Sequence, residues 1–299
     1  AILLRPATLM IVMADILSVF VGRGMFIAPL APVLVVLGTF VIVVGEDFLR
    51  TSRERLFIRE SFGQYLSNDV INELVESGTR PHLGGRNVFM TAMFTDVQKF
   101  STISEQLTPD ALVELLNEYL THMSDIILDK EGTIDKYEGD AIIAFFGAPK
   151  EYPEHAVYAC RSAIMMKQVE EELNKEFLGK SMTPRPLLTR IGINTGDMVV
   201  GNMGTERKMD YTIMGNAVNL AARLEGVNKQ YSTWILMSED TYKKTGDIFT
   251  VRKLDRVRVV GIETPVRLYN LLAEKERTGD DVRSSLELFH EGLEEFENR

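Results

Sequence analysis

Residues 24–45 (GMFIAPLAPVLVVLGTFVIVVG) contain no Asp, Glu, Lys or Arg, and this uncharged run constrains the chain more than any other feature. A helix rises ~1.5 Å per residue, so a run of this length can cross the apolar core of a bilayer. Residues 6–21 are almost as apolar, with Asp15 as their one charge, and Gly22-Arg23-Gly24 offers a turn between the runs. We therefore predict transmembrane helices over residues 1–45, with a helical hairpin buried in a soluble domain as the alternative.

Arg50, Arg53 and Arg55 follow the apolar runs directly. Short flanking segments rich in Arg or Lys tend to stay on the cytoplasmic side of a membrane, so we expect the following domain to lie in the cytoplasm. A cleaved signal peptide fits poorly because the apolar stretch is too long. The chain starts inside an apolar run and without Met, and we expect it to lack an N-terminal portion.

The chain is acidic, with a formal net charge of −10. Residues 1–45 hold two Arg and one Asp, so the acidic excess belongs to the remainder. Non-specific binding of nucleic acid needs a basic face, and we predict no nucleic-acid partner. The single cysteine, Cys160, excludes an intrachain disulfide and a CxxC metal site. Four histidines without an HExxH motif argue against a zinc hydrolase.

Residues 46–85 connect the apolar region to the strands and helices predicted from residue 86 onward. Up to residue 78 the segment is charged and helix-prone, and its apolar side chains recur at helical or heptad spacing, among them Leu49, Leu56, Phe62, Leu66, Val70 and Leu74. Ser67-Asn68-Asp69 offers N-cap side chains, so we predict two helices that meet there. A parallel dimeric stalk and a single helix lying on the next domain are equally open, and residues 79–85 read as a linker.

Strands and helices alternate in the rest of the chain. Strands are predicted at 87–95, 132–137, 141–146, 190–194, 198–202, 234–237, 250–252, 256–260 and 266–271, and helices at 109–129, 153–177 and 216–228. The β-α-β-β-α-β order is that of the ferredoxin-like arrangement, so we predict an α+β sandwich domain over residues 86–272. Residues 273–299 are predicted to form an acidic, amphipathic helical tail.

Two carboxylates lie where a metal ion can be held. Asp96 ends the strand predicted at 87–95, and Asp140 follows Gly139 in a tight hairpin. If the two strands pair centrally, the carboxylates lie side by side and need a counter-cation. Mg²⁺ often takes one or two carboxylates together with substrate phosphates, and two ions ~3.5–4 Å apart can clamp the oxygens of a phosphoryl transfer. The plainer alternatives are a helix-capping Asp96 and a polar turn at Asp140.

A third group of residues lies on the helix predicted at 216–228. Asn219 and Arg223 are four residues apart and therefore share one face of the helix. The Arg223 guanidinium suits a phosphoryl group because it forms planar, bidentate hydrogen bonds. An ion pair between Arg223 and Glu225 is the plainer alternative.

Together and in this order, the motifs resemble those of the class III adenylyl and guanylyl cyclases. They are Asp96, Lys136-x-x-Gly139-Asp140, Tyr211-Thr212-x-x-Gly215-Asn216-x-Val218-Asn219-x-Ala221-x-Arg223, and GINTGDMVVGNMG at 192–204. The resemblance covers residues 86–272. Residues 61–67 and 70–74 also resemble the transducer helix that precedes many bacterial cyclase domains. The whole resembles a bacterial membrane-bound adenylyl cyclase of the inner membrane, with its catalytic domain in the cytoplasm.

The resemblance implies a role for each matching residue. Asp96 and Asp140, with the Val97 carbonyl, would hold two Mg²⁺ (or Mn²⁺) ions. The amides of Phe100, Ser101 and Thr102 would bind the terminal phosphates, and Lys136 and Thr212 would read the purine. Asn219 would orient the ribose, and Arg223 would stabilise charge on the α-phosphate. In this family the metal-bearing face of one subunit meets the Asn/Arg helix of the other, which implies a homodimer.

Lys136 favours ATP over GTP as the substrate. A lysine can donate to adenine N1, which is an acceptor, whereas guanine presents an N1–H donor, and guanylyl members typically carry Glu at this position. Thr212 stands where many adenylyl members carry Asp. The predicted activity is conversion of ATP to 3′,5′-cyclic AMP and pyrophosphate, regulated through the membrane region. Guanylyl cyclase activity and a catalytically silent nucleotide-binding receptor domain are the alternatives.

One motif departs from the family pattern. Members often read Val-Lys-Gly-Lys near the C-terminal strands, whereas this chain reads Val259-Val260-Gly261-Ile262, which removes two lysines and a usual triphosphate contact. Arg258 shares a strand face with Val260. We therefore predict that Arg258 takes over the phosphate contact.

Arg258→Ala is expected to raise the KM for ATP about tenfold, because a hydrogen bond to a charged group contributes roughly 1.5–3 kcal/mol. Initial rates measured against ATP concentration test this expectation. An unchanged KM would exclude the assigned role of Arg258.

Overall fold

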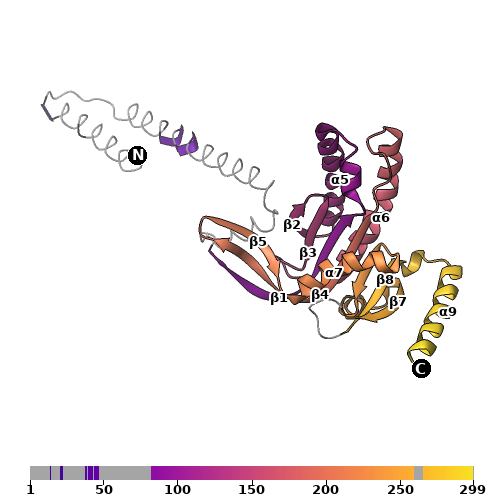
Figure 1. Ribbon diagram of the computed structural model, residues 1–299. Helices are drawn as coiled ribbons and strands as arrows, with labels where there is room; N and C mark the ends of the chain where they lie inside the picture. Colours follow the sequence, from indigo (N-terminus) through magenta and orange to yellow (C-terminus); the bar gives the residue numbers. More distant parts are fainter. Residues whose placement is uncertain are drawn as a thin grey trace. The chain divides into compact units, whose positions relative to one another are not determined.

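The computed structural model describes residues 82–258 and 265–298, together with a few isolated residues between positions 14 and 46 (Figure 1). The chain divides into two units, residues 1–66 and 67–299. The predicted transmembrane helices and stalk lie almost wholly outside the described residues. Among the residues that are described, no helix combines the length and the apolar character needed to span a bilayer.

An eight-stranded mixed sheet forms the centre of the described domain. Its strands are β1 (Gly84–Val97), β2 (Gly132–Glu138), β3 (Ala141–Phe146), β4 (Thr189–Thr205), β5 (Lys208–Met214), β6 (Ile235–Ser238), β7 (Phe249–Val257) and β8 (Val266–Glu274). Seven of them follow the order β2-β3-β1-β4-β6-β8-β7, and β5 pairs with β4 off this path. Only the β4–β6 pair among these is parallel.

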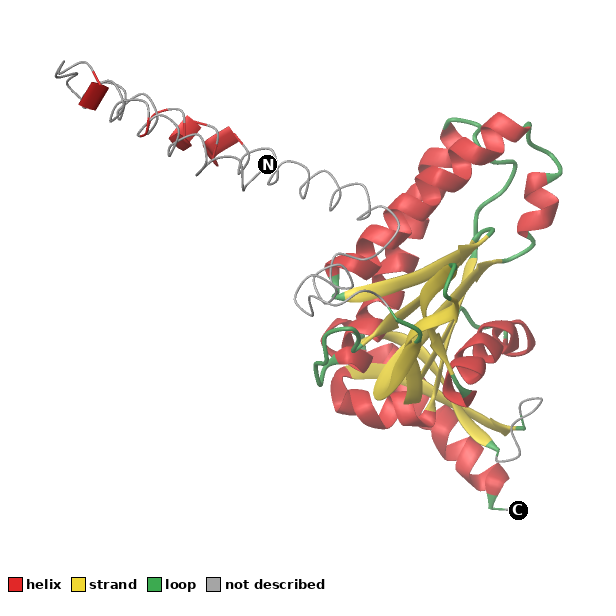
Figure 2. Cartoon of the chain, turned by 90° about the vertical axis from the view of Figure 1, so that its left-hand side faces the viewer, coloured by secondary structure: helices red, strands yellow, loops and turns green. Residues whose placement is uncertain are grey.

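The helices lie on both sides of this sheet (Figure 2). They are α4 (Phe100–Ser104), α5 (Pro109–Asp129), α6 (His155–Gly179), α7 (Asn216–Tyr231), α8 (Glu239–Thr245) and α9 (Asp280–Glu297), with short 3-10 turns at Gly246–Ile248 and Lys275–Arg277. Thr108 caps α5 by accepting a hydrogen bond from the Ala111 amide, and Pro109 occupies its first turn. The local sequence thus fixes the start of α5.

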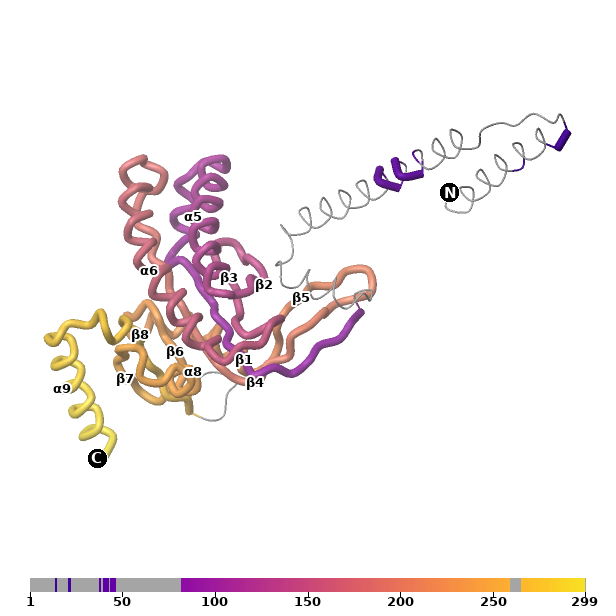
Figure 3. Tube along the Cα trace, turned by 180° about the vertical axis from the view of Figure 1, so that it is seen from behind, coloured from indigo at the N-terminus to yellow at the C-terminus, as the bar shows by residue number. Residues whose placement is uncertain are grey.

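Successive side chains of a strand point to opposite faces of the sheet, so the apolar core lies on both faces. On one face, Phe146 of β3 packs in a cluster with side chains of α5 and α6, which lie side by side (Figure 3). On the other face, Phe145 packs with Ile213 of β5 and Val218 of α7. The second face therefore brings α7 and β5, which carry Asn219, Arg223 and Thr212, over the strands β1 and β3.

The fold confirms the predicted α+β core. The segments β1, α5, β2, β3, α6 and β4 follow the β-α-β-β-α-β order, and their strands lie side by side as β2-β3-β1-β4. The predicted acidic C-terminal helix is α9. The first strand begins at Gly84, two residues before the expected start of the domain.

Two predicted breaks are wrong. The strands predicted at 190–194 and 198–202 are the single strand β4, which continues through Thr195-Gly196-Asp197 because β1 is long enough to pair with it from Gly84↔Asn202 to Val97↔Thr189. Gly196 is a packing residue instead, since an added Cβ would lie 3.0 Å from Ala217 of α7. The strands predicted at 250–252 and 256–260 are the single strand β7, which ends at Val257 and contains two register shifts.

Two short elements were not predicted. The strand β5 pairs with the distal part of β4. The helix α8 begins after Ser238, whose hydroxyl accepts a hydrogen bond from the Thr241 amide. Both had local signals, but neither is long enough to produce a clear periodicity.

Gly192 is the closest point of approach between β4 and α7. A Cβ at this position would overlap the Ala221 carbonyl and the Glu225 amide of the α7 backbone. Overpacking of this kind typically costs about 1–3 kcal/mol. Gly192→Ala is therefore expected to lower the Tm of the full chain by at least about 3 °C, as measured by thermal unfolding.

Gly179→Ala is the matched control, because an added Cβ at the end of α6 meets nothing within 4 Å. It is expected to leave the Tm nearly unchanged. Equal Tm values for the two variants would show that α7 does not pack on β4 as closely as described.

Candidate active site

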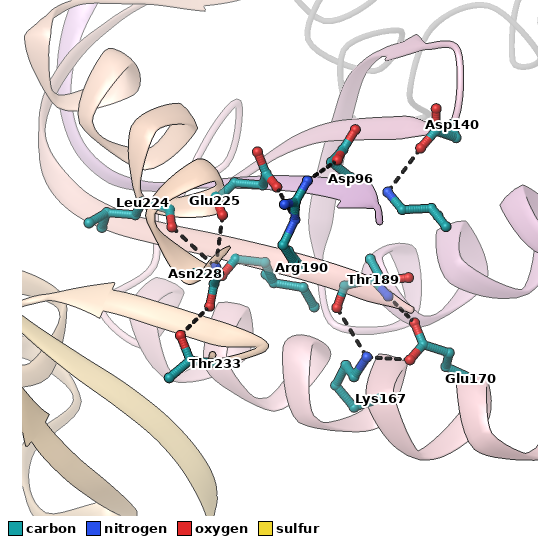
Figure 4. A network of polar contacts seen from close by, with 12 residues as sticks. Asp96, Asp140, Lys167, Glu170, Thr189, Arg190, Leu224, Glu225, Asn228 and Thr233 are labelled. Carbon is teal, nitrogen blue, oxygen red and sulfur yellow. Dashed lines mark hydrogen bonds and ion pairs between the residues drawn. The ribbon is translucent and has the colours of Figure 1, made fainter. Parts of the chain in front are cut away.

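The carboxylates of Asp96 and Asp140 meet at the end of β1. Asp96 is the penultimate residue of β1, and Asp140 lies in the β2–β3 turn, where Gly139 adopts a φ of +67°. The Asp140 carboxylate accepts a hydrogen bond of 2.9 Å from the Val97 amide, the next residue after Asp96 (Figure 4). This one bond brings the three predicted metal ligands, Asp96, Val97 and Asp140, together.

The electrostatics of this corner suit a bound cation. Burial raises the pKa of Asp140, and the nearby charge of Asp96 raises it further, while the Val97 hydrogen bond lowers it. Two carboxylates that repel in this way are stabilised by a divalent ion. In the described residues, no group of three or more His, Cys, Asp or Glu side chains is arranged to hold a metal ion.

Arg190 is a residue of this corner that the sequence patterns did not single out. It lies directly opposite Asp96 in the β1–β4 ladder, and its guanidinium approaches the Asp96 carboxylate to 2.5 Å. Arg190 Nε also lies 2.8 Å from Glu225 of α7, although these two atoms are not aligned as a hydrogen bond. Burial raises the pKa of Glu225 to about 7, and Arg190 opposes that shift. We call the group of predicted metal ligands, Asp96, Val97 and Asp140, the metal corner. The Arg190 side chain connects this corner with Glu225 of helix α7 (Figure 4).

A second set of buried polar contacts holds the strand end that presents Arg190. The Thr189 amide donates to the buried Glu170 carboxylate at 2.6 Å, and the Thr189 hydroxyl bonds Tyr119 of α5 at 2.6 Å. On α7, the Asn228 side chain donates to the Ile191 carbonyl at 2.9 Å. Because buried polar groups need partners, these contacts define the positions of both β4 and α7.

Lys136 and Thr212 both approach the side-chain carboxylate of Asp135. Thr212 of β5 donates a hydrogen bond of 2.7 Å to the Asp135 carboxylate of β2. The Lys136 ammonium lies 3.7 Å from the other oxygen of Asp135. The two residues predicted to read a purine therefore share one carboxylate, although they come from strands that do not pair with each other.

The predicted phosphate-binding amides lie in the first turn of α4, directly after the Asp96 corner. Lys99 before the helix has a left-handed conformation, with a φ of +58°. The Thr102 amide already donates to the Lys99 carbonyl at 3.1 Å. This leaves the amides of Phe100 and Ser101 as the better donors for a phosphate, because the first amides of a helix have no intrahelical acceptor.

Asn219 and Arg223 lie on α7, one turn apart, as predicted. Asn219 is exposed, whereas Arg223 is half-buried, and its Nη1 is buried with no hydrogen-bond partner among the described residues. The alternative ion pair between Arg223 and Glu225 is not observed, since Glu225 faces Arg190. An unpaired guanidinium nitrogen is costly to bury and is suited to bind an anion.

Arg258 lies far along the sheet from the metal corner. It directly follows β7, which forms the opposite edge of the sheet from β2, and it is exposed. Val260 and Ile262 lie outside the described residues. The structure thus places Asp96, Val97 and Asp140 together, and it places Lys136 near Thr212. Within one chain, Arg258 lies near neither group.

The family model for the adenylate and guanylate cyclase catalytic domain matches residues 86–273. The chain belongs to this family. The matched residues include Asp96 on β1, Asp140 in the β2–β3 turn, and Asn219 and Arg223 on α7.

Several cyclases resemble this chain. Adenylate cyclase 1 of Rhizobium meliloti (strain 1021) is 34% identical over 227 residues, which cover 75% of this chain and 33% of that protein. The crystal structure of the adenylyl cyclase CyaB from P. aeruginosa matches with a TM-score of 0.61 and 38% identity, covering 66% of this chain and all of that one. The guanylyl cyclase Cya2 matches with a TM-score of 0.60 and 34% identity over 66% of this chain and 98% of that one. The chain thus spans about a third of the first curated relative.

The metal corner of this cyclase domain predicts a pH dependence. A proton and a metal ion compete for the Asp140 carboxylate, and the raised pKa of Asp140 moves that competition above the ordinary value of 3.8. Mn²⁺ affinity is therefore expected to fall as the pH decreases from 8 to 4, with a midpoint above 3.8. Electron paramagnetic resonance of free Mn²⁺ measures this affinity.

Asp140→Asn is the control for this titration. The variant is expected to bind Mn²⁺ weakly and to lose most of the pH dependence. A wild-type affinity that stays constant down to pH 4 would contradict the assignment of Asp140 as a ligand.

Proposed function

We propose that this chain is an adenylyl cyclase, which converts ATP to 3′,5′-cyclic AMP and pyrophosphate in a homodimer. The observation that carries the proposal is the Asp140–Val97 hydrogen bond, which brings the second carboxylate to the end of β1 beside Asp96. Family membership supplies the reaction class, namely attack of the ribose 3′-hydroxyl on the α-phosphorus. The substrate, the assembly and the membrane attachment are parts of the proposal.

The described residues fit a divalent metal site for triphosphate. Asp96, Asp140 and the Val97 carbonyl would hold two Mg²⁺ or Mn²⁺ ions, which neutralise charge on the phosphates when bound. The Phe100 and Ser101 amides at the start of α4 would bind the terminal phosphate oxygens. Because these groups lie at the end of β1, in the β2–β3 turn that is hydrogen-bonded to it, and at the start of α4, they can bind the triphosphate as one unit.

Selection of ATP rests on Lys136 and Thr212. The Lys136 ammonium can only donate hydrogen bonds, which suits the N1 acceptor of adenine and opposes the N1–H of guanine. Thr212 lies within hydrogen-bond distance of the carboxylate that Lys136 also approaches, so both side chains can face one base. The adenylyl and guanylyl relatives are similarly close in sequence, and these two residues therefore decide the proposed substrate.

The homodimer would complete each site. Asn219 is exposed on α7, and the buried Nη1 of Arg223 has no partner in the described part of the chain. In our proposal, these two side chains face the metal corner of a second copy, where Asn219 orients the ribose and Arg223 stabilises charge on the α-phosphate. A two-fold axis would then create two equivalent sites.

Residues 1–85 would anchor and regulate this domain. We propose that residues 1–45 cross the inner membrane of a bacterial cell and that the helical segment at 46–85 transmits a signal to a cytoplasmic catalytic domain. The uncharged run at 24–45 and the arginines at positions 50, 53 and 55 support this arrangement. A change in the stalk would alter how the two copies assemble the site.

The test is production of cyclic nucleotide by the full chain from ATP or GTP, with Mg²⁺ or Mn²⁺. We expect cyclic AMP from ATP and at least a 100-fold loss of activity in Asp96→Ala, because a ligand of the metal is removed. Asp129→Ala is the control, since Asp129 is an exposed carboxylate at the end of α5.

The possible products separate the alternatives. Cyclic GTP in place of cyclic AMP would contradict the purine assignment and leave the cyclase mechanism intact. No product from either nucleotide, with protein that is dimeric, would favour a silent nucleotide-binding domain and would point to the missing lysines at Val260 and Ile262.

A further inference from the structure

Strand β2 contains a β-bulge at Asp135. Its ladder with β3 shifts register between Ile134 and Lys136, so that Ile134 lies opposite Ala144 and Lys136 lies opposite Ile143. One residue, Asp135, is therefore inserted into the strand. A β-bulge changes the direction of the side chains around it. Here the inserted residue, Asp135, comes directly before Lys136.

The Asp135 carboxylate connects β2 to β5. These strands are not neighbours in the sheet, yet the Thr212 hydroxyl and the Asp135 Oδ2 atom are 2.7 Å apart. The Phe145 ring of β3 and the Tyr211 ring of β5, with centroids 6.3 Å apart, pack against each other. The Asp135 side chain is only 4% exposed, so its hydrogen bond is protected from competition with water.

The direction of this hydrogen bond is fixed by chemistry. An ionised carboxylate has no proton and can only accept, so the single hydroxyl proton of Thr212 is used on Asp135. The Thr212 oxygen then has only lone pairs left for a ligand. Burial raises the pKa of Asp135 above its ordinary value, and the Thr212 hydrogen bond and the Lys136 charge oppose that rise.

We infer that Asp135 is a specificity-determining positioning residue: it orients the Thr212 hydroxyl so that Thr212 can only accept a hydrogen bond from a purine. This inference rests on the proposed nucleotide site. An acceptor at this point pairs with the 6-amino group of adenine and opposes the 6-oxo group of guanine or hypoxanthine.

Asp135 also orders the second base-reading residue. Its Oδ1 atom is buried without a hydrogen-bond partner among the described residues, and the Lys136 ammonium lies 3.7 Å away. The carboxylate thus attracts Lys136 on one side and orients Thr212 on the other. The result is a donor, Lys136, beside an acceptor, Thr212, which is the pattern complementary to N1 and the 6-amino group of adenine.

Four substitutions separate the orientation of the Thr212 hydroxyl from side-chain packing. Asp135→Asn keeps the size of the side chain but supplies an amide donor, so the Thr212 hydroxyl is free to donate its own proton to a 6-oxo group. Thr212→Val keeps the shape and removes the hydroxyl, whereas Thr212→Ser retains it. Asp129→Asn makes the same chemical change as Asp135→Asn at an exposed position on α5.

The experiment compares ATP with ITP, which carries the 6-oxo group but lacks the 2-amino group of guanine. Binding of each nucleotide to the full chain is measured by competition with a fluorescent ATP analogue, and product formation is measured in parallel. In wild type we expect a preference for ATP. In Asp135→Asn we expect this preference to fall about tenfold or more, chiefly through tighter ITP binding, because the mismatched acceptor pair is removed.

The controls define what would support or overturn the inference. Thr212→Ser and Asp129→Asn should keep the wild-type ratio, and Asp135→Asn should have a smaller effect on the ratio in a Thr212→Val background, where only its attraction for Lys136 remains. An unchanged ATP:ITP ratio in Asp135→Asn would overturn the inference. An equal loss of both nucleotides would overturn it as well, because it would show a purely structural role.

The two readouts distinguish this inference from the proposed function. Cyclic AMP production with an unchanged ratio in Asp135→Asn would leave the function standing and remove the role of Asp135. A reduced preference for ATP in Asp135→Asn, without any cyclic nucleotide formed by wild type, would support the role of Asp135 and contradict the cyclase proposal. Binding of neither nucleotide by wild type would contradict both.

Discussion

The hydrogen bond from the Val97 amide to the Asp140 carboxylate is the constraint on which the rest of the site depends. It connects the β2–β3 turn to the end of β1 and places two acidic side chains close enough for the charge of Asp96 to raise the pKa of Asp140. A cation relieves that repulsion. The start of α4 follows Asp96 within a few residues, so groups suited to metal and to phosphate converge on one corner of the sheet.

Helix α7 is held to the same corner by packing and by charge. Gly192 allows its backbone to lie directly on β4, and Glu225 and Asn228 contact Arg190 and the Ile191 carbonyl. Arg190 in turn contacts Asp96. Helix α7, which carries Asn219 and Arg223, therefore contacts the metal corner of its own chain through Arg190. The exposed face of α7 remains available to a second copy.

Much of the core could be predicted because its signals are local. The helix predicted at 109–129 and the strand at 141–146 were obtained with their observed bounds, since the helix has a clear periodicity and a capping residue and the strand is a short apolar run next to a turn. The break predicted between the strands at 190–194 and 198–202 was wrong because a long partner strand satisfies the backbone there. Arg190 and Asp135 were missed because their roles come from cross-strand register and from a β-bulge, which single-sequence patterns do not specify.

The central claim is that each active site combines the metal corner of one copy with α7 of another. Mixing Asp96→Ala with Arg223→Ala tests it directly, because a heterodimer of the two inactive variants contains one intact site. We predict that neither variant alone forms cyclic AMP and that an equimolar mixture, after subunit exchange, recovers roughly a quarter of wild-type activity. A mixture that exchanges subunits and stays inactive would contradict the account.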